Sequence, residues 1–137
     1  MSAQENINIA QQAYANFASG DIGSLLGMLS EDVRWTLPEI ENVPFAGARQ
    51  GREAVGQFFA SIAELQEAVE FTPQTFTAQD DRVVVQGRYR WRIKATGREY
   101  SADWVHVFTI RDGQVVSFQE YTDTALAAAA FRQAMNA

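Results

Sequence analysis

The N-terminal part of the chain carries hydrophobic side chains at helical spacing. They recur at intervals of three and four residues, at Ile7, Ala10, Tyr14 and Phe17. This spacing predicts an amphipathic helix. The letters SGD follow, in which Gly20 is suited to end this helix and Asp21 to cap the next. We expect a short second helix over IGSLLGML.

The pattern changes at VRWTL, where apolar and polar residues alternate as far as Pro38. This alternation predicts a first short strand that ends at the proline. Residues 38–50, PEIENVPFAGARQ, then predict a loop with an exposed Phe45. Helical spacing returns in GREAVGQFFASIAEL and predicts a third helix. Its apolar face carries Val55, Phe58, Phe59 and Ile62.

After this helix the hydrophobic period becomes two. Alternating segments are separated by turn-forming letters such as ATG and RDG, which predicts four consecutive strands. These strands are VEFTPQTF, RVVVQGRYRWRIK, REYSADWVHVFTI and QVVSFQEY. A last helix is predicted over TALAAAAFRQAM. The order of elements predicts one α+β domain over residues 1–137, with helices on one face of an antiparallel sheet.

The strand RVVVQGRYRWRIK separates apolar from basic side chains. One face carries Val83, Val85, Tyr89, Trp91 and Ile93. The other carries Gln86, Arg88, Arg90, Arg92 and Lys94. We expect the basic face to meet water or a partner subunit and to pair with Asp or Glu on neighbouring strands. An anion site on this face is the alternative.

Composition and charge exclude several classes of protein. The 137 residues include 17 acidic and 11 basic side chains, a net charge of −6, which argues against binding to nucleic acid or to an anionic membrane. No apolar run has the length of a membrane span, and the N-terminus MSAQENINIAQQAY is unlike a signal peptide. We therefore expect a cytoplasmic protein.

The same counts limit the chemistry. The chain has no cysteine and one histidine, so disulfides, thiolate nucleophiles and multi-histidine metal centres are excluded within one chain. Nucleotide-binding glycine motifs and the G-x-S-x-G motif are missing from the sequence. We expect neither a metal nor a cofactor.

The single histidine, His106, lies within the predicted hairpin DWVHVFTIRDGQVVSFQEYTD. A three-residue loop closed by Gly113 is the favoured turn, and it places His106 opposite Phe118 and Trp104 opposite Glu120. In this register Glu120 is a diagonal neighbour of His106. The residues of the shared face are Trp104, His106, Phe108, Phe118, Glu120 and Thr122.

A two-residue turn over Asp-Gly gives a different hairpin. It shifts the register by one residue and places His106 opposite Gln119. Tyr121 and Asp123 then share the face of His106. Because Asp123 directly precedes the last predicted helix, it is also a candidate cap for that helix.

A histidine beside a carboxylate among aromatic side chains can act as a general acid or base. The carboxylate would orient the imidazole and favour the imidazolium, whereas burial would lower the pKa of the imidazole. The structural alternative is that His106 only fills space and bonds to Glu120 or to a backbone carbonyl.

Three stretches of the chain resemble a known family. FASGDIGSLLGMLSEDVRWTLP, GREAVGQFFASI and WVHVFTIRDGQVVSFQEYTD are similar to the SnoaL-like, ketosteroid-isomerase-related proteins of the nuclear transport factor 2-like superfamily. The resemblance covers nearly the whole chain. It implies a cone in which three helices from the N-terminal half close over a curved antiparallel sheet, with a short C-terminal helix. It also implies a deep apolar pocket and a homodimer formed through the sheet.

The catalytic groups of relatives carry over poorly. Ketosteroid isomerase uses an aspartate base and an oxyanion hole of a tyrosine and a protonated aspartate. The resemblance places Leu37 at the position of the aspartate base, Ala13 (with Tyr14 next to it) at that of the tyrosine, and His106 at that of the protonated aspartate. These differences argue against steroid isomerisation of that type. Arg90 and Asp103 do not reproduce the spacing of the Asp-Arg-Asp set of limonene epoxide hydrolase. SnoaL-type cyclases use an acidic residue for aldol ring closure, and the histidine–carboxylate pocket expected here is compatible with that reaction.

The resemblance and the hairpin together lead to three hypotheses. The first is a cofactor-independent isomerase, cyclase or hydrolase that transfers protons on a small hydrophobic carbonyl or ring compound, with His106 as acid/base and Glu120 or Asp123 as its carboxylate. The others are a non-catalytic binding module and a dimerisation scaffold. The expected substrate-binding residues are Tyr14, Trp35, Phe45, Trp104, Phe108 and Phe118.

Overall fold

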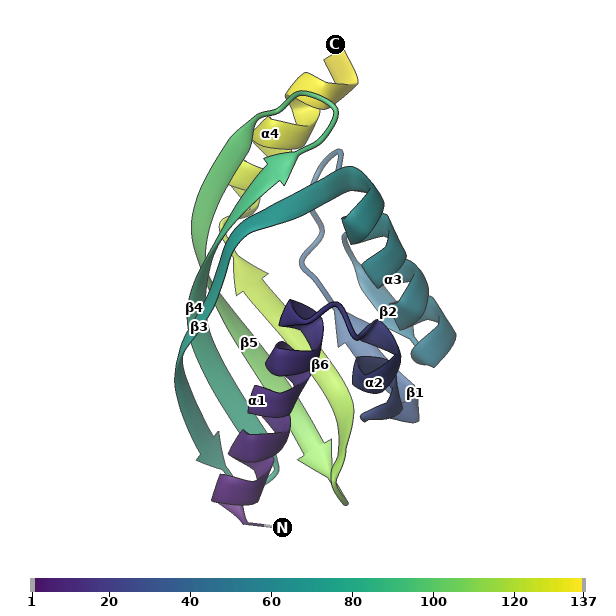
Figure 1. Cartoon of the computed structure of the whole chain (residues 1–137), viewed down its shortest axis with the longest axis vertical. Helices are drawn as coiled ribbons and strands as arrows, with labels where there is room; N and C mark the ends of the chain where they lie inside the picture. The colour runs from purple at the N-terminus through teal and green to yellow at the C-terminus, as the bar shows by residue number, and fades with distance from the viewer. Residues whose placement is uncertain (1, 137) are drawn as a thin grey trace.

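The computed structural model describes residues 2–136, which form four helices and six strands (Figure 1). The helices are α1 (Ala3–Ala18), α2 (Ile22–Gly27), α3 (Arg52–Leu65) and α4 (Thr124–Asn136). The strands are β1 (Leu29–Thr36), β2 (Ala48–Gln50), β3 (Gln66–Gln79), β4 (Arg82–Ile93), β5 (Glu99–Arg111) and β6 (Gln114–Thr122). No helix within this described part of the chain is both long enough and apolar enough to cross a membrane.

The strands form one sheet in the order β2-β1-β6-β5-β4-β3. Adjacent strands of the sheet are antiparallel except for β1 and β6, which run parallel. The prediction of an antiparallel sheet is therefore corrected at this pair. The parallel pair arises because β1 and β6 are not joined by a turn: β2, α3 and three strands intervene in the chain. The α+β class and the curved sheet of the expected cone are observed.

Helices α1, α2 and α3 lie on one side of the curved sheet, and α4 lies at the end of β4 and β5 (Figure 1). The long strand β3 has two register shifts, between Ala68 and Glu70 and between Pro73 and Thr75. Bulges of this kind bend a strand and increase its twist. The curvature brings the inward faces of β3 to β6 around a common interior beneath the helices.

The turn between α1 and α2 forms as expected. Gly20 has a φ of 76°, in the left-handed region that favours glycine, and Asp21 Oδ1 accepts a hydrogen bond from the backbone N–H of Ser24. Ser2 and Glu5 form a capping box at the start of α1. These local bonds fix where α1 begins and ends, and so fix the position along the helix from which Tyr14 points into the interior.

The loop between β1 and α3 differs from the prediction in two ways. Its last residues form β2, in which Arg49 pairs with Trp35; three residues are too short to show a period-two pattern. Phe45, expected to be exposed, is 5% exposed. It packs edge-on against Phe58 of α3 and Phe131 of α4, so this part of the loop folds inward.

The basic face of β4 is paired as predicted. Arg88 lies 3.7 Å from Asp103, Arg90 lies 2.7 Å from Glu99, and Arg92 contacts Glu67. All these side chains are at least one-third exposed, so each pair contributes about 1 kcal/mol or less to stability.

Candidate functional site

The β5–β6 hairpin closes with a two-residue turn, not with the predicted three-residue loop. Asp112 and Gly113 have positive φ angles of 51° and 78°, and Arg111 pairs directly with Gln114. Positive φ at both central positions is typical of the type I′ turn, whose twist matches that of the flanking strands. This turn alone would place His106 opposite Gln119.

A β-bulge changes that outcome. The register shifts between the pairs Thr109–Ser117 and Ile110–Val115, so β6 holds one extra residue at this point. As a result His106 lies directly opposite Glu120. The alternative two-residue turn and its register are therefore confirmed at the turn but not at His106, and the favoured three-residue register is wrong. The shared face of His106 and Glu120 that the favoured register predicted is observed.

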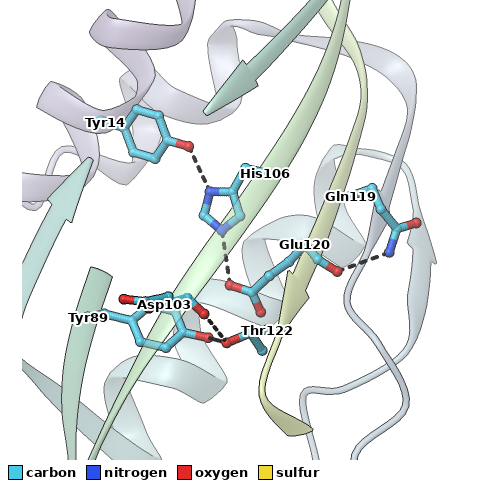
Figure 2. Close-up of polar contacts among 7 residues, drawn as sticks. All are labelled: Tyr14, Tyr89, Asp103, His106, Gln119, Glu120 and Thr122. Atoms are coloured by element: carbon cyan, nitrogen blue, oxygen red, sulfur yellow. Dashed lines mark hydrogen bonds and ion pairs between the residues drawn. The ribbon is translucent and has the colours of Figure 1, made fainter. Parts of the chain in front are cut away.

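The imidazole of His106 is bonded on both sides (Figure 2). Its Nε2 lies 3.0 Å from Oε1 of Glu120, and its Nδ1 lies 2.7 Å from the hydroxyl oxygen of Tyr14. His106 is 3% exposed and Glu120 is 8% exposed. The three side chains come from β5, β6 and α1, and they form one continuous hydrogen-bonded chain, which we call the relay.

Aromatic packing fixes the plane of the imidazole. The ring of Trp104 stacks on His106 at a centroid distance of 3.9 Å and an angle of 20°. Trp104 in turn lies against the backbone of Gly87 on β4, where a β-carbon would overlap its six-membered ring. Gly87 therefore makes room for the indole that holds the imidazole in line with its two partners.

The surroundings set the protonation of the relay. Burial lowers the pKa of His106 below its ordinary value, and the hydrogen bond and charge of Glu120 offset this only in part. Burial, followed by the charge of Glu120, raises the pKa of Tyr14. At neutral pH the imidazole is therefore uncharged and the phenol protonated. The Tyr14 hydroxyl donates to Nδ1, and the imidazole N–H at Nε2 donates to Glu120.

A cavity of about 80 Å³, partly open to solvent, lies between the helices and the sheet. A cavity that holds a single water needs only about 10–15 Å³, so this larger cavity has room for a slim molecule or a small ring. Most of its lining is aliphatic or aromatic. The polar lining residues other than tryptophan are Tyr14, Gln66, Tyr89, Tyr100, His106 and Glu120.

The predicted site residues do not all meet at this cavity. Those that line it are Tyr14, Trp35, Phe45, His106, Phe108, Phe118 and Glu120. Trp104 lies behind His106 and is 2% exposed. Asp123 is exposed, and its Oδ1 accepts a hydrogen bond from the backbone N–H of Leu126 in the first turn of α4. The structure therefore places Asp123 at a helix cap, away from the cavity lining.

Three polar lining residues were missed by the sequence reasoning. Tyr89 was assigned to the inward face of β4 but not to the site; its hydroxyl donates to Thr122 Oγ1 at 2.9 Å. Tyr100 and Gln66 had no assignment. Gln66 lies at the junction of α3 and β3, ahead of the predicted start of that strand, so no alternating pattern indicated which way it points.

Within residues 2–136, no group of three or more histidine or acidic side chains is placed to hold a metal ion. The chemistry that the arrangement offers is proton transfer. A hydroxyl, an imidazole and a carboxylate in series let the hydroxyl oxygen accept a proton while it passes its own to the imidazole, and the carboxylate stabilises the imidazolium that forms. Here the hydroxyl group of this series is the phenol of Tyr14.

Comparison with known proteins places this geometry in context. A family model described as a SnoaL-like domain matches residues 10–118. An NTF2-like protein from Burkholderia xenovorans LB400 is 36% identical over 96% of this chain and 98% of its own, with a TM-score of 0.87. An NTF2-like protein of unknown function from Burkholderia pseudomallei K96243 is 27% identical, with 96% and 98% covered and a TM-score of 0.83. TerC, co-crystallised with polyporic acid, is 28% identical, with 93% and 98% covered and a TM-score of 0.83. No protein with a curated description matches.

Proposed function

Because the chain belongs to the SnoaL-like domain family, we propose that it is a cofactor-independent enzyme that transfers a proton on a small, largely apolar carbonyl compound. One observation carries the proposal: the relay of Tyr14, His106 and Glu120 lies in the wall of an otherwise mostly apolar cavity. An apolar cavity with a few convergent polar groups is the usual form of a small-molecule site.

The proposed reaction begins with removal of a proton from the carbon next to the substrate carbonyl. That proton goes to the phenol oxygen of Tyr14, while the hydroxyl proton of Tyr14 goes to Nδ1 of His106. The products of this step are an enolate and an imidazolium. The Nε2 of this imidazolium lies 3.0 Å from Oε1 of Glu120. Reversal of the transfer onto a different carbon gives an isomer. Attack of the enolate carbon on a second carbonyl group of the substrate gives a ring, and the relay then returns its proton to the new alkoxide.

The site holds the imidazole ready for this transfer and offsets part of the cost of charging it. An uncharged imidazole is ready to accept a proton, and an unpaired imidazolium would be costly at 3% exposure. Glu120 reduces that cost because the buried cation forms beside a carboxylate already hydrogen-bonded to it. TerC, which is similar over nearly its whole length, was co-crystallised with polyporic acid, which supports a small organic ligand for this chain.

Exchange of α-protons for deuterium tests the proposal without knowledge of the natural substrate. The probe is β-tetralone, a small bicyclic ketone, incubated with the protein in deuterium oxide and followed by proton NMR. The wild type should accelerate exchange over buffer. Tyr14→Phe should lose most of that acceleration, about a hundred-fold or more, because general acid–base groups contribute about 10²–10⁴-fold. Tyr121→Phe, an exposed tyrosine on β6, is the matched control and should behave as the wild type.

The deep burial of His106 favours one alternative, a binding module in which the relay only provides fixed polar contacts for a ligand. The two functions differ in the same experiment. Binding of β-tetralone with no accelerated exchange would support the binding module and would contradict the enzyme. Equal acceleration by the wild type and Tyr14→Phe would also contradict the proposed relay.

A further inference from the structure

Gln66 is a buried amide in the cavity wall that the proposed reaction does not use. The residue is 3% exposed and lines the cavity, and its Oε1 has no hydrogen-bond partner among the residues that the structure describes. A buried amide without its partners is unfavourable, and native structures hold few such groups. The amide torsion of glutamine is broad, so this group can turn either polar atom toward a ligand.

The backbone holds Gln66 firmly in this place. Its N–H donates to the carbonyl of Ile62 at the end of α3, and its Cα pairs with Ile93 on β4. The backbone N–H of Lys94 donates to the carbonyl of Leu65 next to it, at 3.0 Å. The side chain is therefore set at the helix–strand junction by bonds that do not depend on the side chain itself.

Gln66 and the relay lie far apart along the sheet. The β4 partner of Gln66 is Ile93, and the β4 partner of His106 is Val85, eight residues away. Eight residues of extended strand span roughly 26 Å at most, a distance that the curvature of the sheet shortens. Both side chains nevertheless line the same cavity. A molecule that contacts both has to reach along this part of β4.

We infer that Gln66 is a second hydrogen-bonding anchor of this cavity, and that its ligand is a slim, elongated apolar molecule with one polar group at the relay and a hydrogen-bond donor, such as a hydroxyl, at the far end. This inference rests on the proposed function, since it assigns the other end of the ligand to the relay. It narrows the ligand class from any small apolar carbonyl compound to one with polar groups at both ends.

A chemical cycle with flexible probes tests this anchor. The probes are n-octanol, n-decanol and n-dodecanol, each compared with its α,ω-diol, and affinities are measured by calorimetry. The ratio of diol affinity to alcohol affinity measures what the second hydroxyl contributes to binding. The change of this ratio in a variant measures how much of that contribution comes from contact with the substituted side chain. For the diol whose length fits, the ratio should fall about five-fold in Gln66→Met, the effect of one lost hydrogen bond. Gln79→Met, an exposed glutamine on the same strand, should leave it unchanged.

Thermal unfolding of the ligand-free variants supplies a second readout. Gln66→Met should unfold at the same or a higher temperature than the wild type, because it replaces an unpaired buried amide by an apolar group of similar size. A purely structural glutamine would give the opposite result, a clear loss of thermal stability.

The outcomes separate this inference from the proposed function. An unchanged affinity ratio in Gln66→Met at every chain length overturns the anchor, and so does a marked drop in its unfolding temperature; accelerated exchange of β-tetralone would leave the proposed function standing. Failure of all the alcohols and diols to bind the wild type also overturns the anchor. Failure of β-tetralone exchange as well would overturn both.

Discussion

His106 and Glu120 face each other directly across the β5–β6 hairpin, with Nε2 of the imidazole 3.0 Å from Oε1 of the carboxylate. This pairing requires the bulge near the turn. The two-residue turn alone would place His106 opposite Gln119, and the extra residue of the bulge shifts the pairing by one residue to Glu120. The side chain that completes the site, Tyr14, comes from α1 and reaches the other nitrogen of the ring. The relay thus depends on the hairpin and on the packing of α1 against the sheet.

The first prediction concerns stability and pH. Burial lowers the pKa of His106 in the folded protein, so below about pH 6.5 the unfolded chain binds a proton that the folded chain does not. The free energy of unfolding should therefore fall as the pH falls from about 7 to 5. His106→Gln removes this group, and its curve should be shallower by up to about 1.4 kcal/mol per pH unit. Urea unfolding across this range measures both slopes, and parallel curves would rule out a buried neutral imidazole.

The second prediction concerns the glycine beneath Trp104. A β-carbon at Gly87 would overlap the indole, so Gly87→Ala must displace the ring that stacks on His106. We expect a loss of about 1–3 kcal/mol in the free energy of unfolding, and slower exchange of β-tetralone. Gly27→Ala is the control, since nothing lies within 4 Å of the added methyl group. Wild-type stability in Gly87→Ala would show that Trp104 is not held in this way.

The third prediction separates Asp123 from the site. Asp123→Ala removes the cap of α4 and should lower the free energy of unfolding by about 0.5–2 kcal/mol, with no change in the rate of β-tetralone exchange. Asp123→Ser should restore most of the stability, since serine also caps helices well. A large loss of exchange in Asp123→Ser, at restored stability, would instead place this carboxylate in the reaction.

The fourth prediction concerns assembly. The outer face of the sheet carries an uncharged patch beside the paired arginines, formed by Val84, Val105, Val107 and Tyr121, of which Val84 is 36% and Tyr121 57% exposed. We expect a homodimer through this patch, because exposed apolar patches commonly mark interfaces. Sedimentation equilibrium should give twice the mass of the chain. Val84→Lys should give the monomer, whereas Gln57→Lys on α3 should not; a monomeric wild type would refute the expectation.

Much of the fold followed from local chemistry. Asp21 and Gly20 mark the break between α1 and α2 because a cap and a left-handed residue are set by the chain immediately around them. The alternation in β4 predicted both its inward face and its ion pairs, since the period of a strand is fixed by its pleat. The SnoaL-like resemblance was confirmed by the family match over residues 10–118.

The features that escaped prediction depend on long-range packing. The bulge on β6, opposite Thr109 and Ile110, is marked by no glycine or other turn-forming residue, and the parallel pairing of β1 with β6 joins segments that are distant in sequence. The bond from Tyr14 to His106 spans 92 positions of the chain, so the sequence indicated Tyr14 only as a substrate-binding residue and gave no sign of its contact with the imidazole. Gln66 lies at a junction where neither the helical period nor the strand period applies.

The proposed relay requires that His106 is an uncharged imidazole that accepts a hydrogen bond from Tyr14 and donates one to Glu120. Because the chain has one histidine, the ¹⁵N NMR spectrum of its side chain reports this imidazole alone. At about pH 7 we expect a proton on Nε2 and none on Nδ1, an imidazole pKa below the ordinary value of about 6.5, and a changed Nδ1 resonance in Tyr14→Phe. A charged imidazolium at this pH, or a proton on Nδ1 of the neutral ring, would contradict the proposed relay.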